Sequence, residues 1–371
     1  MSIINVKSTT PISTLAVVFK GSVANETEKN YGISHLMEHL QCKNLHPMYE
    51  NLTKYNISHN AYTTDNCIVF YMTGLEKYLS KFRKEFLDRL FKFEITESVL
   101  ENEIAIVLQE YLNYFSQQAS SHYYNLFRKK YGFYSAIGSR KALENISLKD
   151  CKDYYELQYS KPHMLINISQ GVIFDETIEF QENYKEIEPF VEKDSLNDIE
   201  IVADFAKSTS IINYKCINED FKELNVLCDI LGRGLESPLY AKIREEKGLV
   251  YYIQSDVSKI SNNQGFLFIS SELENKNVKE FQKTLKEVLE EGITEERFEI
   301  VKHSLIARKE RVEILNFTDY EKYIHPEDDL SEEFLSNLTF NRIKEVYDKH
   351  FNNLNESIDK EEFKEVIELP G

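Results

Sequence analysis

The chain has no tryptophan, few cysteines and no long apolar run, and each shortage excludes something. Its five cysteines, Cys42, Cys67, Cys151, Cys216 and Cys228, are odd in number, widely spaced and without a C-x-x-C pair. We therefore expect neither a disulfide framework nor a thiolate zinc site, and reduced thiols favour a cytoplasmic location. Because no run of about 18 apolar residues occurs, we expect no membrane span.

Basic residues are scarce relative to acidic ones. The chain has 44 Lys and Arg against 62 Asp and Glu, a formal net charge of −18. A nucleic-acid binder needs a basic face to meet phosphates, so this balance argues against nucleic acid as a partner. The 371 residues are 42% hydrophobic, with 23 Phe and 23 Tyr in place of tryptophan, which is enough to build two globular domains of ordinary size.

The most informative stretch is the pentapeptide HLMEH at residues 35–39. In a helix, His35 and His39 lie one turn apart on the same face and can share one ion. Zinc binds histidine nitrogen at ~2.0–2.1 Å and keeps a fourth position open in catalytic sites. Glu38 lies beside that face, where a carboxylate can act as a general base in hydrolysis. For the pentapeptide alone, the alternative is an amphipathic helix with two solvated histidines, capped by Ser34.

A second predicted helix supplies two further carboxylates. It begins after Thr96, its expected N-cap, and runs to about residue 114. Glu103 and Glu110 are seven residues apart and therefore lie on one face of that helix. Taken alone they fit a solvated acidic stripe, since Glu101 is adjacent. A site with two imidazoles needs a third ligand, however, and a glutamate on another helix provides it in His₂Glu zinc sites.

A short internal sequence repeat indicates that the chain has two halves with the same architecture. The tripeptide ITE opens a long helix at residues 95–97 and again at residues 293–295. We predict an α+β fold with two homologous domains, each a mostly antiparallel sheet packed with helices, in which only the first keeps metal-binding residue types. The predicted domains are residues 1–180 and 199–371, joined by an exposed linker over 181–198. Strands are expected over residues 13–19, 60–71, 163–170, 208–216, 250–255 and 265–271.

These features together resemble the pitrilysin/insulinase family of zinc peptidases with the inverted H-x-x-E-H motif. The resemblance is to its short-chain branch, which includes the mitochondrial processing peptidases and bacterial homologues. The stretch NAYT at residues 60–63 matches the family's substrate-pairing edge strand. The stretch PLYAKIREEKGLVY at residues 238–251 matches its arginine/tyrosine segment, and residues 137–138, Tyr159 and Pro162 match the end of its first domain.

The resemblance implies a catalytic metal centre. His35, His39 and Glu110 would hold one Zn²⁺ per chain, with Glu38 as the general base and Glu103 as a supporting acidic residue near the metal. The implied activity is that of a zinc metalloendopeptidase.

The resemblance also implies how substrate is held. Arg244 and Tyr251 would bind the substrate backbone and the developing oxyanion, which a guanidinium and a phenol can stabilise. Without the family pattern these two would be interpreted as a surface ion pair and a core tyrosine. Residues Asn60, Ala61, Tyr62 and Thr63 would pair main chain to main chain with an extended peptide, whereas the default for one such segment is a buried or hairpin-paired strand.

Family members enclose substrate between two halves of a clamshell, each built from two such domains. A chain of this length supplies one half, so the resemblance implies a dimer. A homodimer is the simplest assembly, and a heterodimer with a related subunit is the alternative. The expected substrates are unfolded peptides or leader- and presequence-like segments. A second hypothesis is a non-catalytic partner subunit that acts mainly in substrate binding, and a small-molecule metallohydrolase is disfavoured because it has no use for an edge strand.

Overall fold

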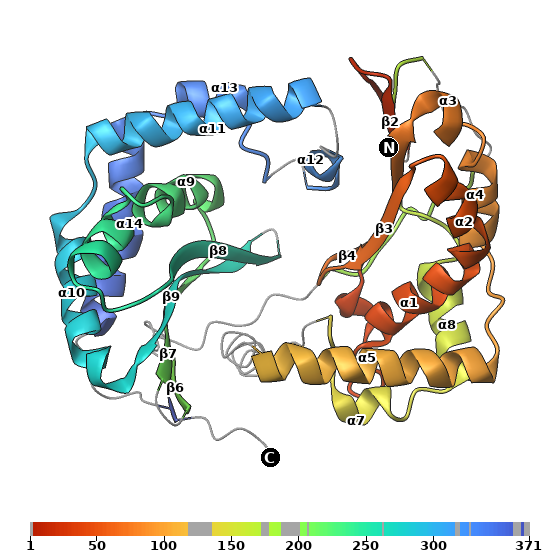
Figure 1. Cartoon of the computed structure of the whole chain (residues 1–371), viewed down its shortest axis with the longest axis horizontal. Helices are drawn as coiled ribbons and strands as arrows, with labels where there is room; N and C mark the ends of the chain where they lie inside the picture. Colours follow the sequence, from red (N-terminus) through yellow and green to blue (C-terminus); the bar gives the residue numbers. More distant parts are fainter. Residues whose placement is uncertain are drawn as a thin grey trace. The chain divides into compact units, whose positions relative to one another are not determined.

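The computed structural model of the protein describes residues 3–117, 136–171, 178–186, 201–205, 208–261, 263–315, 320–325, 328–358 and 365–366. The chain divides into two compact units. The first comprises residues 1–117, 125–188 and 310–327, and the second comprises residues 118–124, 189–309 and 328–371. Each unit contains one five-stranded sheet with its own apolar core (Figure 1).

The sheet of the first unit is mostly antiparallel. Its strands are β1 (Ile3–Lys7), β2 (Ile12–Lys20), β3 (Ser58–Thr63), β4 (Cys67–Leu75) and β5 (Met164–Ser169). They lie in the order β1-β5-β2-β4-β3, so β1 and β3 are the edges. Only the β1–β5 pair is parallel. Because no described strand pairs with the other side of β3, a further strand can add at this edge.

The central strand β2 is buried on both faces, which explains the apolar run at its residues 15–19. Successive side chains of a strand point to opposite faces. Leu15, Val17 and Phe19 accordingly pack in the cluster under the helices, while Ala16 and Val18 pack in a separate cluster on the other face.

Helices of the first unit cover one face of this sheet. They are α1 (Ile33–Leu45), α2 (Tyr49–Lys54), α3 (Glu76–Leu79), α4 (Arg83–Leu90), α5 (Glu97–Gln117), α7 (Arg140–Leu143) and α8 (Leu148–Gln158), with 3₁₀ turns η1 (Val23–Asn25) and η2 (His46–Met48). Side chains from α1, α2, α4, α5 and α8 share a core with the inner residues of β2 and β4. This layer fixes α1 and α5 beside each other in the first unit (Figure 1).

The other face of the sheet is covered by residues from far along the chain. Tyr320 and Ile324, each 2% exposed, pack against Ala16, Val18 and Ile166. They belong to or flank the short helix α12 (Glu321–Ile324). The predicted second domain covered all of residues 199–371, whereas the described residues 310–315 and 320–325 belong to the first unit. The reason is that β2 and β5 need apolar cover on this face, and α12 supplies it.

The second unit repeats the plan of the first. Its sheet has the order β10-β6-β7-β9-β8, again with one parallel pair, between β10 and β6. The strands are β6 (Ile201–Phe205), β7 (Ser208–Ile217), β8 (Ile253–Ser261), β9 (Gln264–Glu274) and β10 (Glu365–Val366). The helices are α9 (Phe221–Gly232), the π-helix η3 (Tyr240–Glu246), the 3₁₀ turn η4 (Asn275–Asn277), α10 (Val278–Glu291), α11 (Glu295–Leu315), α13 (Glu332–Asn337) and α14 (Phe340–Ile358). The predicted α+β class with two similar, mostly antiparallel domains is confirmed.

One strand prediction was wrong. The single strand expected over residues 60–71 is a hairpin, β3 and β4, because Thr64 Oγ1 accepts hydrogen bonds from the backbone N–H groups of Asn66 and Cys67 and closes a turn. The strand expected over residues 13–19 lies within β2 and is confirmed, whereas β1 before it was not predicted. The linker expected over 181–198 falls within the described residues only at 181–186. None of the described helices is both long and apolar enough to cross a membrane.

Candidate metal centre

Helix α1 carries three of the predicted site residues. Its buried side chains include Ile33, Leu36, Met37 and Leu40, which face the core of the first unit. The 3.6-residue period then leaves the two histidines on a common side. The imidazole rings of His35 and His39 lie with centroids 4.8 Å apart and planes at 87°. The sequence therefore places both rings at one spot on the helix.

Helix α5 brings the third candidate ligand to that spot. Glu110 Oε2 lies 3.6 Å from His35 Nε2 and 3.5 Å from His39 Nε2. Two ligands of a tetrahedral zinc ion, each at ~2.1 Å, are separated by about 3.4 Å. The observed separations match that edge of a tetrahedron and are too long for strong hydrogen bonds.

The three side chains thus converge as the sequence predicted. Their ligand atoms all lie within 4.8 Å of one another, and in the described part of the chain His35, His39 and Glu110 are the group with this property. Two neutral imidazoles and one carboxylate are the donor set of catalytic His₂Glu zinc sites. The residues present therefore fit a zinc ion.

His39 is held from its other side by Glu103. Glu103, 3% exposed, has Oε2 at 3.3 Å from His39 Nδ1, so the ring N–H donates to the carboxylate and Nε2 keeps its lone pair. Lys43 Nζ lies 2.9 Å from the other oxygen, Oε1, of Glu103. Such outer partners fix the tautomer and orientation of a metal-binding histidine. Sequence reasoning missed Lys43, although its position four residues after His39 places it on the same helix face.

The surroundings of His35 favour the neutral ring that a metal needs. Burial, and then the nearby His39, lower the pKa of His35 to about 4. Its Nδ1 atom is buried and has no hydrogen-bond partner among the described residues. His35 is therefore neutral at pH 7, and its Nε2 faces Glu110.

Glu38 is buried next to this group but is not part of it. Its side chain is 8% exposed, and its Oε2 accepts a hydrogen bond from Thr63 Oγ1 at 2.9 Å. Burial raises the pKa of Glu38, while the hydrogen bond from Thr63 acts in the opposite direction. A carboxylate with a raised pKa is a stronger base than an ordinary one, which suits it to accept a proton beside a metal site. The sequence analysis placed Thr63 on the edge strand but did not foresee this side-chain contact.

The predicted substrate-binding segment lies on the edge strand. Residues Asn60 to Thr63 belong to β3, which pairs with β4 on one side and with no described strand on the other. Thr63 at its end contacts Glu38 as described above. Its alternate side chains face different layers, since Ala61 packs toward the helices and Tyr62 toward the opposite face.

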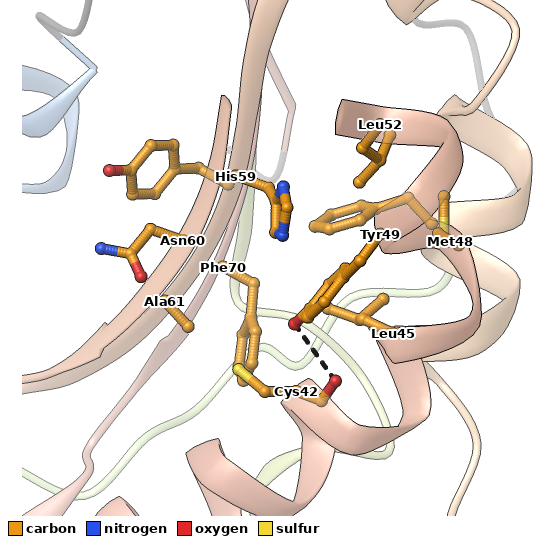
Figure 2. Close-up of a pocket in the computed structure, with 11 residues that line it drawn as sticks. Cys42, Leu45, Met48, Tyr49, Leu52, His59, Asn60, Ala61 and Phe70 are labelled. Atoms are coloured by element: carbon orange, nitrogen blue, oxygen red, sulfur yellow. Dashed lines mark hydrogen bonds between the residues drawn. The ribbon is translucent and has the colours of Figure 1, made fainter. Parts of the chain in front are cut away.

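An apolar pocket opens between β3 and the helices α1 and α2, as Figure 2 shows. Cys42 and Tyr49 line it from the helical side, and His59 and Ala61 line it from the strand. The rings of Tyr49 and His59 lie 4.1 Å apart, and the Tyr49 hydroxyl donates to the backbone carbonyl of Cys42 at 3.1 Å. The pocket lies along the edge strand whose last residue, Thr63, contacts Glu38.

Arg244 and Tyr251 belong to the second unit. Arg244 lies in η3, and its guanidinium carbon is 5.5 Å from the Tyr240 ring centroid and 5.2 Å from that of Tyr251. Tyr251 is 85% exposed, so its hydroxyl is open to a ligand, and it is not the core tyrosine of the plainer interpretation. Residues 240–246 form a π-helix, a conformation that is rare and often occurs at functional sites.

The second unit does not repeat the metal-binding residues. Helices α5 and α11 both span 21 residues and start with the same ITE tripeptide. Aligned on that tripeptide, Glu103 corresponds to Val301 and Glu110 to Arg308. The carboxylates that complete the site in α5 are thus absent at the matching positions of α11.

The fold and this site define a two-domain α+β protein with a His₂Glu metal-binding geometry, and comparison with known proteins gives the family. The family model "Insulinase (Peptidase family M16)" matches residues 2–135, and "Peptidase M16 inactive domain" matches residues 177–305. The chain belongs to this insulinase family, peptidase family M16. The predicted resemblance is confirmed.

Curated relatives carry contrasting names. "Non-peptidase homolog YmxG" of Helicobacter pylori is 23% identical over 46% of this chain and 44% of its own length. "Uncharacterized zinc protease YmxG" of Bacillus subtilis is 22% identical over 76% of this chain and 74% of its own length.

Solved structures share the fold. The crystal structure of a protease from Helicobacter pylori has a TM-score of 0.78 and 19% identity, and the match covers 95% of each chain. The periplasmic protease PqqL from Escherichia coli has a TM-score of 0.68 and 13% identity. That match covers 95% of this chain but 45% of PqqL, so this chain spans about half of PqqL.

Proposed function

We propose that the protein is a zinc metalloendopeptidase that cleaves unfolded peptides or leader- and presequence-like segments. The observation that carries the proposal is the convergence of His35, His39 and Glu110 at separations that fit one tetrahedral zinc ion. These three residues would hold the ion. The chemistry that zinc supplies when bound is Lewis acidity, which activates water and polarises a carbonyl.

The chain's own residues account for the proton transfers. Glu38 takes a proton from the attacking water and delivers it to the leaving amine, as a buried carboxylate with a raised pKa can do. Glu103 holds His39 in the tautomer that leaves Nε2 free. Arg244 and Tyr251 bind the substrate backbone and stabilise the oxyanion by a positive charge and a phenolic hydrogen bond.

We propose that the substrate peptide binds along the edge strand β3. An extended peptide adds to β3 through main-chain hydrogen bonds, which accept many sequences. Residues 60–63 lead directly to Glu38 through the Thr63 hydroxyl, so a peptide paired there passes the metal centre. Folded proteins are poor substrates, since their backbones are already paired.

The decisive experiment measures zinc content and peptide cleavage together. Purified protein is expected to contain about one zinc per chain and to cleave members of a peptide library. Glu38→Gln keeps the size of the side chain and all three metal ligands, so it should retain zinc and lose cleavage. A protein that binds no zinc, or a Glu38→Gln variant that cleaves as well as the wild type, would contradict the proposal.

The second candidate function is a non-catalytic subunit that binds substrate for a related peptidase. The relative named as a non-peptidase homologue favours it, as does the match of the second half to an inactive domain. The complete set of metal-ligand residue types in α1 and α5 favours catalysis. The Glu38→Gln variant separates the two functions. A binding subunit would bind peptide without cleaving it, and its partner peptidase would be equally active with the wild type and with Glu38→Gln.

We further propose that the protein works as a dimer. This chain spans about half of PqqL, a longer protein of the same fold, and a second copy would supply the equivalent of the remaining half. A homodimer is our first proposal and a heterodimer with a related subunit the alternative. The mass of the purified protein in solution distinguishes a dimer from a monomer, and co-purification from the native host would reveal a different partner. A cytoplasmic location is also proposed, on the ground that the five cysteines are odd in number, widely spaced and without a C-x-x-C pair, and cell fractionation tests it.

A further inference from the structure

Helix α1 begins without a capping side chain of its own. Its N-cap residue is Gly32, at φ 98°, a conformation that favours glycine. The first N–H groups of a helix have no partner inside it and must be satisfied from elsewhere when buried. Here the partner is Glu26, which lies upstream of the helix. Its Oε2 accepts from the Gly32 N–H at 3.0 Å, and its Oε1 accepts from the Ser34 N–H at 2.9 Å.

Glu26 is a buried carboxyl group that caps helix α1. It is 7% exposed. Burial raises the pKa of Glu26 to about 7, while the hydrogen bonds from Ser34 and Gly32 act in the opposite direction. The positive end of the helix dipole also favours a carboxylate at this position. The buried carboxyl group therefore caps the helix at Ser34, the residue directly before the first metal-ligand candidate, His35.

The start of α1 is held on its other sides as well. Ser34 Oγ and the Tyr154 hydroxyl lie 2.8 Å apart, and the Tyr154 hydroxyl donates to the Ser22 carbonyl at 3.1 Å. A Cβ added to Gly138 would lie 2.3 Å from the Gly32 Cα, so these two backbones meet where no side chain fits. The backbone at the first turn of the helix is therefore closely packed, and Glu26 accepts hydrogen bonds from two of its N–H groups.

The segment that carries Glu26 is also bonded to the edge hairpin. The Gly21 N–H donates to the Asn66 carbonyl at 2.7 Å, and the Val23 N–H donates to the Asp65 carbonyl at 3.1 Å. Asp65 and Asn66 form the turn between β3 and β4, directly after Thr63. Residues 21–26 therefore connect the first turn of the metal helix to the end of the proposed substrate strand.

We propose that Glu26 is a positioning residue that sets helix α1 relative to strand β3, so that His35 and Glu38 face the metal centre. This inference rests on the proposed function for its catalytic consequence, but its effect on metal binding is independent of cleavage. Glu26 acts through the helix and touches neither metal nor peptide. Without its carboxylate the first turn frays, and the imidazole of His35 is no longer held toward Glu110.

The test compares two helix-cap variants in the full chain. Glu26→Gln places an N–H₂ group against one of the two backbone N–H donors, so it loses at least one of the two bonds. We expect its zinc dissociation constant, measured by competition with a chromophoric chelator, to rise about five- to tenfold. Ser147→Ala is the control, because Ser147 caps α8, which carries no candidate metal ligand. It should leave zinc affinity within twofold of the wild type.

At saturating zinc, Glu26→Gln should also lower kcat for peptide cleavage and leave KM within twofold, since β3 itself is unchanged. An unchanged zinc affinity in Glu26→Gln, or an equal loss in Ser147→Ala, overturns the positioning role and leaves the proposed function intact. A wild-type protein that binds zinc without cleaving peptides overturns the proposed function and leaves the positioning role intact.

If Glu26→Gln does not fold, hydrogen exchange in the wild type decides instead. The Gly32 and Ser34 amides should then exchange as slowly as the Leu36 amide inside the helix, and rapid exchange at either overturns the proposal.

Discussion

Thr63 donates a hydrogen bond from its side-chain oxygen to Glu38 Oε2 over 2.9 Å. This single contact joins the last residue of the edge strand to the carboxylate proposed as general base. A peptide paired with β3 would therefore lie at a fixed position relative to the proposed proton acceptor, Glu38. The contact also uses one oxygen of Glu38 and leaves the other for proton transfer.

Removal of the Thr63 hydroxyl should reduce catalysis without loss of the metal. Thr63→Val keeps the shape and β-branching of the side chain but leaves Glu38 without its donor. We expect kcat to fall about tenfold, since a hydrogen bond to a charged group contributes about 1.5–3 kcal/mol, part of which orients the base. Zinc content and KM should stay within twofold of the wild type. Thr63→Ser keeps the hydroxyl and serves as the control, and full activity in Thr63→Val would refute the role of the contact.

Glu103 should matter for metal affinity more than for folding. Its carboxylate accepts from His39 Nδ1 and pairs with Lys43, so Glu103→Gln weakens the hold on the His39 tautomer. Loss of an outer partner of this kind weakens metal binding about 10–100-fold. Chelator competition measures the effect. Glu101→Gln, on an exposed position of the same helix, is the matched control, and an equal loss in both variants would contradict the assignment.

The metal centre could be predicted from sequence because its geometry follows from local periodicity. His35 and His39 are one turn apart in any helix, and Glu103 and Glu110 are two turns apart in another, so their faces follow from numbering alone. The periodicity does not show that the two helices meet, and this expectation came from the resemblance to a family. The buried strand β2 was equally readable, because a strand covered on both faces must be apolar throughout.

Other features were not readable because they depend on contacts between distant segments. The cap of α1 comes from Glu26, upstream of the helix, whereas the sequence suggested Ser34, which lies inside it. Helix α12 has four residues, too few for a periodic signal, and it packs on a sheet formed some 150 residues or more earlier in the chain. The turn after Thr63 depends on one hydroxyl, that of Thr64.

Acid should destabilise the second unit through Asp220. Burial alone would raise the pKa of this carboxyl group, but hydrogen bonds from Lys349, His350 and Arg342 outweigh it and lower the pKa from 3.8 to about 2. A lowered folded-state pKa stabilises the fold fully above the unfolded value of 3.8, and the contribution is lost as pH falls toward 2. The shift corresponds to about 2 kcal/mol at pH 7. Burial also lowers the pKa of His350, so its protonation acts in the same direction.

The measurement compares wild type with Asp220→Asn. Asp220 has φ 61°, a left-handed conformation that asparagine tolerates, so the substitution removes charge without backbone strain. Urea unfolding followed by circular dichroism should show the variant less stable at pH 7 and the difference shrinking at pH 3. A difference that is constant between pH 7 and pH 3 would show that the charge of Asp220 contributes nothing.

Helix α12 should stabilise the first unit although it lies late in the sequence. Ile324 is 2% exposed in a cluster with Val18, Val69 and Ile168. Ile324→Ala removes buried methyl groups and leaves a cavity, so we expect the first unit to lose about 2–4 kcal/mol of stability. Hydrogen exchange should show faster opening of β2 and β5 with little change in β7 and β9. Ile300→Ala, at a position 49% exposed on α11, should be nearly neutral. Faster exchange in β7 instead of β2 would mean that residues 320–325 support the second unit.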